Sequence, residues 1–259
     1  MDAVRKNRLF QHSTMAALVG GLFSGTTSFK ELLQHGDLGI GTLDQFDGEL
    51  IILDGEAFQI RSDGQAYKVK PEDTTPYAST TFFDADTSFS VSEPTSKQAV
   101  EEKIAELVQG PNVFYAVKMT GNFRYVDTRV VPKQQRPYPP LIEAVKEQPT
   151  YHFEYITGTI VGFWTPAYIS GIGVSGYHVH FIDDMRKIGG HVFDYEMLEG
   201  TVEVAQQTEF ELQLPQTTEF LRSDLSTPDM LEQIEAAEKL KKESSQIKLG
   251  AFFYSVITL

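Results

Sequence analysis

The chain has 259 residues, of which 41% are hydrophobic and 12% aromatic, and it carries a formal net charge of −14 and no cysteine. Such a chain can bury a sizeable core in one large domain or two small ones, so its composition excludes a disordered protein. The negative charge repels phosphate backbones and disfavours nucleic-acid binding, and the lack of cysteine excludes disulfides and thiolate ligands for a metal.

The amino-terminal region superficially resembles a signal peptide, because three basic residues precede an apolar stretch at 15–23. That stretch is short, contains two glycines and lacks a good cleavage site after it. We therefore interpret 12–23 as an amphipathic helix of the fold and 28–35 as a second short helix, with a signal peptide as the alternative. No run of 18 apolar residues indicates a membrane span.

The next part of the chain has the alternation typical of strands, interrupted by one clear helix. The Asp54-Gly55 turn joins strands at 49–53 and 56–61 into a hairpin. A helix is predicted where apolar residues form one stripe that Gly110 and Pro111 end, at 97–108. Further strands are predicted at 66–69, 80–83, 88–91, 113–120 and 123–131, the last two joined at Gly121-Asn122.

After a proline-rich connection at 132–140 and a short helix at 141–147, the pattern changes to successive strands. Their close spacing favours an antiparallel sheet. A helix capped at Thr227-Pro228 and extending to 242 is predicted next, followed by an apolar strand at 251–257. The predicted strands of this part are 151–163, 176–182, 191–198 and 201–214.

The change of pattern near 135–150 indicates a second sheet, mostly antiparallel, that carries three closely spaced histidines.

The three histidines are the strongest indication of chemistry in the chain. His178 and His180 are two residues apart on a predicted strand, so their side chains project from the same face. A turn at Gly189-Gly190 and a returning strand can bring His191 beside them. Three neutral imidazoles with an open position are typical of a catalytic metal site. The alternative is three unrelated histidines, one in the core and two on the surface.

Two other side chains are candidates for a site. Glu49 shares a strand face with Ile51 and Leu53, so its carboxylate needs a metal or an arginine as partner, unless it reaches water at a sheet edge. Arg129 can bind a substrate carboxylate through two parallel hydrogen bonds. The alternative for Arg129 is a structural ion pair with Asp127 on the same strand face.

Glu238 is a further candidate, in the predicted terminal helix. It lies four residues after Ile234 and seven after Leu231, so it shares their buried stripe. A carboxylate on this stripe would face the interior of the protein.

The sequence resembles the α-acetolactate decarboxylase family, whose enzymes convert 2-acetolactate to acetoin and CO2. The resemblance covers nearly the whole chain, and three separated motifs in the right order make it specific. The matching stretches are 41–50 with the hairpin that follows, 114–129, and 176–181 through 189–191.

The resemblance implies one divalent metal ion, Zn²⁺, on His178, His180 and His191. It implies that Glu49 and Arg129 are active-site residues, and that a late carboxylate from the tail falls on Glu238, with Glu235 one turn earlier as the alternative. It also implies an α/β chain of the α+β type with two domains. A mixed β-sheet with flanking helices would occupy residues 1–145, and a smaller, mostly antiparallel β-sheet, with the terminal helix and tail, would occupy residues 146–259. A homodimer is implied as well. Many relatives are secreted with a leader, whereas this chain begins almost at the mature fold, so we expect a cytoplasmic protein.

The implied reaction is a metal-dependent decarboxylation of 2-acetolactate to acetoin and CO2 through a metal-stabilised enediolate. No organic cofactor is expected, because the ketone of the substrate and the metal together accept the electrons. Arg129 would orient the carboxylate of this anionic small molecule, and either Glu49 or Glu238 would deliver the proton. We expect neither a nucleic acid nor a membrane as partner.

Two alternatives remain at this point. A cupin-like non-haem iron dioxygenase also uses two histidines in this spacing and a third later in the chain. A non-catalytic metal-binding protein would take up metal without turning over acetolactate, and it gives no reason for Glu49 and Arg129 to lie beside the metal.

Overall fold

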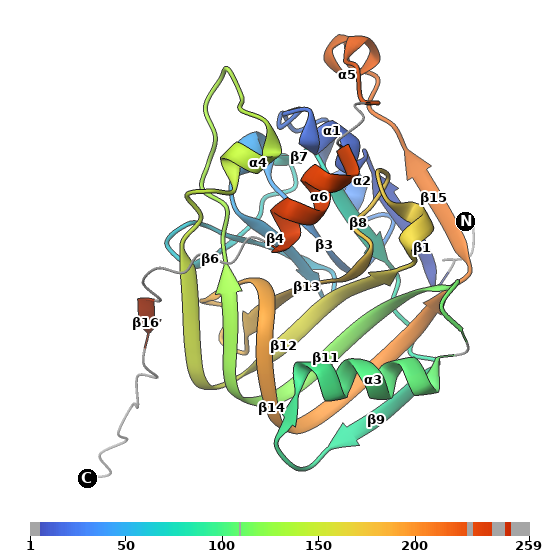
Figure 1. Cartoon of the computed structure of the whole chain (residues 1–259), viewed down its shortest axis with the longest axis vertical. Coiled ribbons are helices and arrows are strands. Elements are labelled where there is room, and N and C mark those ends of the chain that lie inside the picture. Colours follow the sequence, from blue (N-terminus) through green and yellow to red (C-terminus); the bar gives the residue numbers. More distant parts are fainter. Residues whose placement is uncertain (1–5, 109, 227–229, 240–246, 250–259) are drawn as a thin grey trace.

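Two sheets, each with seven strands among the described residues, form the body of the protein (Figure 1). The computed structural model describes residues 6–108, 110–226, 230–239 and 247–249, except the side chains at 235, 238, 239 and 247–249. The predicted helix cap at Thr227-Pro228 and the predicted strand at 251–257 lie outside these residues. The α+β fold class is confirmed, because strands of two sheets dominate and a few short helices flank them.

The first sheet is mixed, as predicted, because β1 pairs in parallel with β15 and the other neighbours are antiparallel. The expected hairpin is β4 and β5, whose register pairs Leu53 with Glu56. In spatial order the strands are β15 (Glu209–Gln213), β1 (Arg8–His12), β8 (Ala78–Thr81), β3 (Leu38–Thr42), β4 (Glu49–Leu53), β5 (Glu56–Ile60) and β6 (Ala66–Lys68).

The second sheet carries the histidines and is antiparallel apart from its pairing with β16. Its strands are β9 (Thr87–Val91), β10 (Thr95–Ser96), β11 (Phe114–Arg129), β12 (Thr150–Thr165), β13 (Gly176–Asp183), β14 (Gly189–Gln207) and β16 (Ile247–Leu249). It is not the smaller sheet that we expected, because β9, β10 and β11 join it from before residue 145. The division into domains at 145/146 stays a prediction, since the membership of sheets alone does not define independent units.

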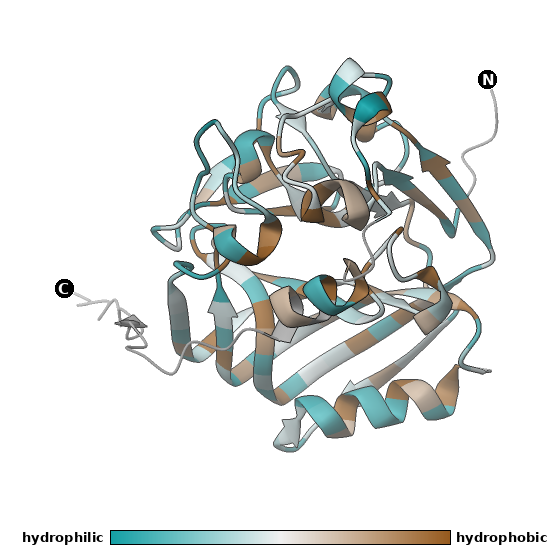
Figure 2. Ribbon diagram, turned by 45° about the horizontal axis from the view of Figure 1, so that its top comes forward, coloured by the Kyte–Doolittle hydropathy of each residue, from teal (hydrophilic) through white to brown (hydrophobic). Residues whose placement is uncertain are grey.

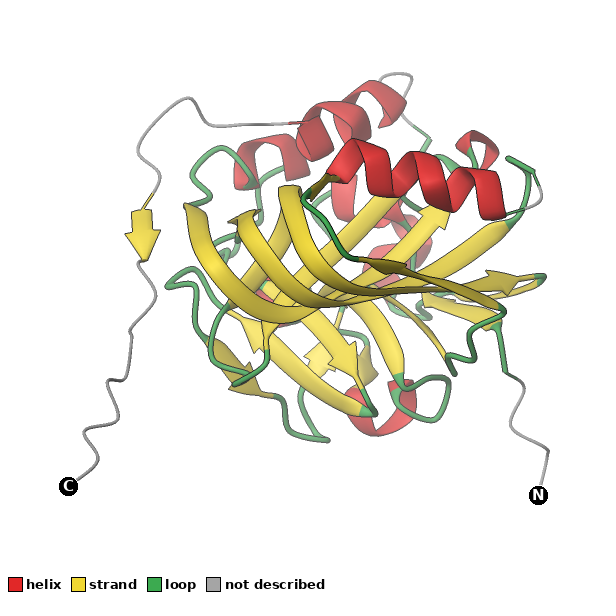
Figure 3. Cartoon of the chain, turned by 90° about the horizontal axis from the view of Figure 1, so that it is seen from below, coloured by secondary structure: helices red, strands yellow, loops and turns green. Residues whose placement is uncertain are grey.

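Four strands of the second sheet form a closed ring of pairings. β14 pairs with β11, β11 with β12 and β12 with β13, and β13 then pairs again with β14 through three residues that include His180 opposite His191. The strands bend strongly to make this closure, as Figure 3 shows. The largest hydrophobic core joins the two sheets, with Ile40 and Ile51 from the first and Val117, Val161 and Phe181 from the second.

Three glycines on neighbouring strands form a row across the bent second sheet. Gly121 of β11 pairs with Gly158 of β12 on one side and with Gly200 of β14 on the other. A Cβ atom at Gly121 would lie 2.1 Å from the carbonyl oxygen of Glu199, so only glycine allows the strands to approach this closely.

The glycine row corrects two predictions. The chain does not turn at Gly121-Asn122 but continues through it as one strand of 16 residues. The strands predicted at 191–198 and 201–214 are likewise wrong, because β14 runs unbroken for 19 residues and the chain then enters β15 of the other sheet. Glycine, which is common in turns, here permits curvature instead.

Hydroxyl side chains cap several of the short helices. α1 (Met15–Val19) begins after Thr14, and α2 (Phe29–Leu32) begins after Ser28, which forms a capping box with Glu31. α3 (Lys97–Leu107) buries Val100 and Ile104 and carries polar residues on its other face (Figure 2). The remaining helices are α4 (Leu141–Ala144), α5 (Thr218–Arg222) and α6 (Met230–Lys239), with a two-stranded sheet of β2 (Thr27–Ser28) and β7 (Thr74–Thr75).

Helices α1, α4 and α6 pack against one another (Figure 1). Their apolar residues form a separate cluster that includes Leu18, Val145 and Ile234. None of the helices in the described part of the chain is both long and apolar enough to cross a membrane.

Gly121→Ala tests the close approach of β11 and β14. The added methyl group meets a backbone oxygen that cannot rotate away, so we expect the free energy of unfolding to fall by about 2 kcal/mol. Urea denaturation measures this loss. Gly173→Ala is the matched control, because the nearest atom to its Cβ lies 3.4 Å away and no shift is needed. Equal stability of the two variants would contradict the role of the glycine row.

Candidate metal centre and active site

The three predicted histidines converge. His178 and His180 lie on β13, and His191 lies on β14 directly opposite His180 in the register. Their ring centroids are 5.0 to 5.3 Å apart, and one nitrogen from each ring lies within 4.8 Å of the others. Alternation along β13 and the closure of the ring of strands therefore place three nitrogen donors around one point.

His180 shows most clearly that these donors fit a metal ion. Its side chain is fully buried, and its Nδ1 lies 2.8 Å from the carbonyl oxygen of Leu50. Because a carbonyl only accepts, Nδ1 must donate and the lone pair lies on Nε2. Among the described residues that Nε2 has no hydrogen-bond partner. A buried lone pair without a partner, on a ring oriented by a backbone carbonyl, is typical of a metal ligand.

The histidines are neutral at physiological pH. Burial, followed by the nearby Arg129 guanidinium, lowers the pKa of His178 to about 3. Burial also lowers the pKa of His180 and of His191 well below the ordinary value, and Arg129 and the neighbouring imidazoles act in the same direction. Neutral imidazoles are the form that binds a divalent ion of borderline softness, so the set suits Zn²⁺.

Arg129 ends β11 and is only 5% exposed. Its Nη1 donates to the carbonyl oxygen of Ala237 on α6 at 2.9 Å, and its Nη2 lies 3.2 Å from Nε2 of His191. The guanidinium thus connects the second sheet to α6 and places a fixed positive charge beside the histidines. The carboxylate of Asp127, which we considered as its alternative partner, lies 2.5 Å from Nδ1 of His152.

Glu49 reaches the same site from the first sheet. It is the first residue of β4 and is 9% exposed. One carboxylate oxygen accepts a hydrogen bond from the backbone N–H of Val131 at 3.1 Å, and the other lies 3.5 Å from Nε2 of His180. The carboxylate is therefore held by protein groups at the junction of the two sheets, rather than at a sheet edge in water.

For the predicted late carboxylate the structure describes only the helix backbone, not the side chain. Glu238 and Glu235 both lie on α6, but their side chains are outside the described part of the structure. Ile234 and Ala237 on the same helix are buried, and α6 packs against α1 and α4. The choice between the two glutamates stays a prediction.

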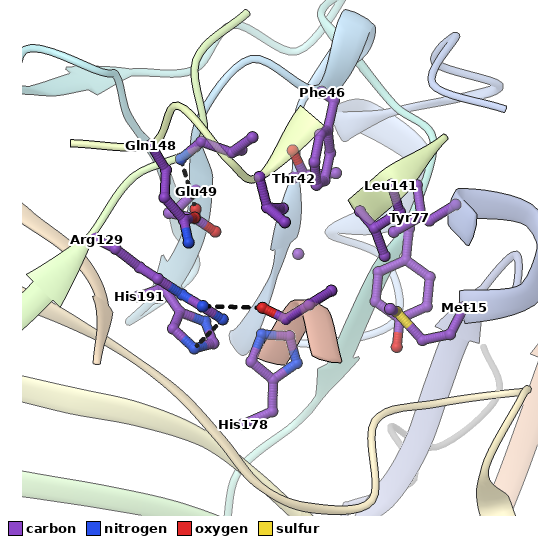
Figure 4. Close-up of a pocket in the computed structure, with 15 residues that line it drawn as sticks. Met15, Thr42, Phe46, Glu49, Tyr77, Arg129, Leu141, Gln148, His178 and His191 are labelled. Carbon is purple, nitrogen blue, oxygen red and sulfur yellow. Dashed lines mark hydrogen bonds between the residues drawn. The ribbon is translucent and has the colours of Figure 1, made fainter. Parts of the chain in front are cut away.

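A cavity of about 50 Å³ is lined by Glu49, Arg129, His178 and His191 together with other residues (Figure 4). Sequence reasoning missed several of its lining residues, which come from segments that meet only in the folded chain. No sequence pattern indicated Gln148, between α4 and β12, whereas Thr42 lies inside the 41–50 motif and could have been found there. The lining residues not predicted are Met15, Leu18, Gly41, Thr42, Phe46, Tyr77, Val131, Leu141, Val145, Gln148 and Ala237.

Comparison with known proteins identifies the family. The family model for alpha-acetolactate decarboxylase matches residues 9–227. The alpha-acetolactate decarboxylase of Bacillus licheniformis is 46% identical over 240 residues, which cover 92% of this chain and 95% of that protein. The Bacillus subtilis strain 168 protein of the same name is 44% identical over 232 residues, covering 90% of this chain and 91% of that one.

Solved structures agree with the sequence comparison. The crystal structure of alpha-acetolactate decarboxylase from Bacillus subtilis strain 168 matches with a TM-score of 0.87 and 44% identity, covering 89% of this chain and 99% of that one. A Staphylococcus aureus protein described as similar to alpha-acetolactate decarboxylase matches with a TM-score of 0.86 and 38% identity, over 89% of this chain and all of that chain. The chain therefore belongs to the α-acetolactate decarboxylase family of carboxy-lyases.

Proposed function

We propose that this chain decarboxylates 2-acetolactate to acetoin and CO2 through an enediolate, with one Zn²⁺ ion held by His178, His180 and His191. The observation that carries the proposal is the buried Nε2 lone pair of His180, which lacks a partner among the described residues and faces Glu49. The names of the family relatives support the substrate and the reaction.

The bound ion would supply Lewis acidity towards the hydroxyl and ketone oxygens of the substrate. Arg129 would orient the substrate carboxylate so that the bond to the departing CO2 stands perpendicular to the plane of the ketone. One lone pair of His191 cannot serve both Arg129 and an ion, so the contact between Nη2 and Nε2 of His191 would be given up if that nitrogen held the ion. In a chain with a net charge of −14, this buried cation attracts an anionic substrate locally.

Glu49 would donate the proton that the enediolate takes up. When CO2 leaves, the electron pair of the broken bond passes to the ketone, and the resulting enediolate must take up a proton on carbon. The N–H of Val131 holds one oxygen of Glu49 and leaves the other directed towards His180 and the cavity. Glu238 is the alternative donor, and the same assay on variants of both residues separates the two roles.

The apolar wall of the cavity would exclude water during this step. Met15 and Leu18 come from α1, Phe46 follows β3, and Leu141 and Val145 come from α4 and its end. Such a wall fits the two methyl groups of acetolactate and protects the enediolate from protonation by solvent. The homodimer and the cytoplasmic location stay predictions from the resemblance.

Removing a histidine should remove both metal and activity. We expect His180→Ala to lose the bound metal and at least a hundredfold in turnover, because only two nitrogen donors remain. The measurements are metal analysis and acetoin release from acetolactate without oxygen. His35→Asn is the control, since His35 stacks on Phe10 away from the site. Oxygen-dependent turnover would instead favour the dioxygenase alternative, and metal uptake without turnover would favour a binding protein.

Glu49→Gln should separate proton transfer from metal binding. The amide keeps an oxygen for the N–H of Val131 but carries no transferable proton, so we expect kcat to fall by about a hundredfold while metal content stays unchanged. Steady-state kinetics and metal analysis on one preparation check this. Glu56→Gln, at an exposed ion pair with Lys68, should retain wild-type values. Wild-type turnover of Glu49→Gln would assign the proton to the other glutamate.

The lowered pKa values of the histidines predict how the metal-free protein responds to acid. Below the ordinary pKa of 6.5 the unfolded chain binds protons that the folded chain excludes, so stability is lost as the pH falls from 6.5 towards 3. The slope is at most about 1.4 kcal/mol per pH unit for each such histidine. Urea denaturation of chelator-treated protein between pH 7.5 and 5 measures it. His178→Asn should show a flatter dependence, and equal slopes would disprove the pKa assignment.

A further inference from the structure

Gln148 is a buried amide that faces the cavity. It lies in the connection between α4 and β12, is 4% exposed, and lines the cavity together with Glu49 and Arg129. In Figure 4 its side chain points towards Glu49, above Arg129. No sequence motif drew attention to this residue, and the mechanism proposed above does not use it.

The backbone holds Gln148 close to Arg129. Because Pro149 follows it, Gln148 is restricted to an extended conformation. The carbonyl oxygen of Pro149 accepts a hydrogen bond from the N–H of Val130 at 3.1 Å, and Thr150 pairs with Arg129 in the β11–β12 register. The position of Gln148 is therefore set by the strand end that also carries Arg129.

The amide of Gln148 makes no hydrogen bond to any of the described residues. The other three buried glutamines in the described part of the chain all do: Gln11 donates to the carbonyl oxygens of Ser13 and Ile172, Gln59 to that of Asp47, and Gln207 to that of Ala205. A buried amide without a hydrogen-bond partner is costly, and Gln148 is among the residues that line the cavity. The natural partner for such a group is a bound ligand.

We propose that the amide N–H of Gln148 donates a hydrogen bond to the carboxylate of the bound substrate, beside Arg129. This inference rests on the proposed function. The carboxylate is the acceptor that Arg129 would hold, and Gln148 is fixed next to that guanidinium. The hydroxyl and ketone oxygens would be directed towards the histidines.

A neutral donor suits this position for a chemical reason. During decarboxylation the C–C bond breaks, the negative charge moves from the carboxylate to the ketone oxygen, and neutral CO2 leaves. A contact that stabilises the carboxylate more than the transition state raises the barrier. A second cation beside Arg129 would have this effect strongly, whereas an amide contributes orientation with a weaker hold on the charge.

The test uses two near-isosteric variants of Gln148. Gln148→Met removes the donor and should raise KM for acetolactate about tenfold with kcat within about threefold, the size expected for a hydrogen bond to a charged group. Gln148→Glu replaces the donor with a like charge and should lower kcat/KM further, by about a hundredfold. Gln148→Met should keep the wild-type melting temperature or exceed it, because the removed amide has no hydrogen-bond partner among the described residues.

Two controls isolate the contact. Gln11→Met removes a buried amide that is hydrogen-bonded inside the protein, so it should lower the melting temperature and leave KM unchanged. Inhibition by the product acetoin, which has no carboxylate, should have the same inhibition constant in wild type and Gln148→Met. A change in that constant as large as the change in KM would place the contact elsewhere and overturn the proposal.

The possible results distinguish a failure of the proposed role of Gln148 from a failure of the proposed decarboxylase function. A wild-type protein that releases no acetoin refutes the proposed function. An active wild type with an unchanged KM in Gln148→Met refutes only the role of Gln148. Loss of folding in Gln148→Met would also refute it, because an amide without a hydrogen bond to the described residues should not be required for stability.

Discussion

The site depends on the closure of the second sheet, where β13 returns to pair with β14. That pairing is short, yet it sets His180 directly opposite His191 and completes the ring that runs through β11 and β12. The ring closes only because the strands bend, and the bend requires that Gly121 approach Gly200 without a side chain between them. The geometry of the histidines is thus a consequence of curvature in strands that lie partly outside the site.

The end of β11 organises the groups around the histidines. Three consecutive residues each make a different connection: Arg129 contributes its side chain, the N–H of Val130 binds Pro149, and the N–H of Val131 binds Glu49. A single strand end therefore connects the first sheet, the segment before β12 and helix α6. The groups proposed to bind the carboxylate, to carry the proton and to orient the substrate share one rigid support, which favours a preorganised site.

The charge at the site is opposite in sign to the net charge of the whole chain. The chain is strongly acidic, but burial keeps the three imidazoles neutral, because it disfavours charged imidazole. The buried guanidinium of Arg129 acts in the same direction and presents a positive charge to the cavity. The site therefore combines available lone pairs with a local attraction for an anion, and it needs no change in the surface charge of the protein.

Much of the site could be predicted from the sequence, because alternation along a strand determines that His178 and His180 share a face, and the motifs around Glu49, Arg129 and His191 indicate the family. The sequence also determined the hairpin of β4 and β5 and the α+β composition. It did not determine that β11 and β14 are continuous, since glycine serves both turns and bends and only the neighbouring strands select between them. Nor could it indicate Gln148, whose proposed role comes from its lack of a hydrogen-bond partner among the described residues. Only the tertiary structure decided such matters, because closure of a sheet and the satisfaction of a buried amide depend on which distant segments come into contact.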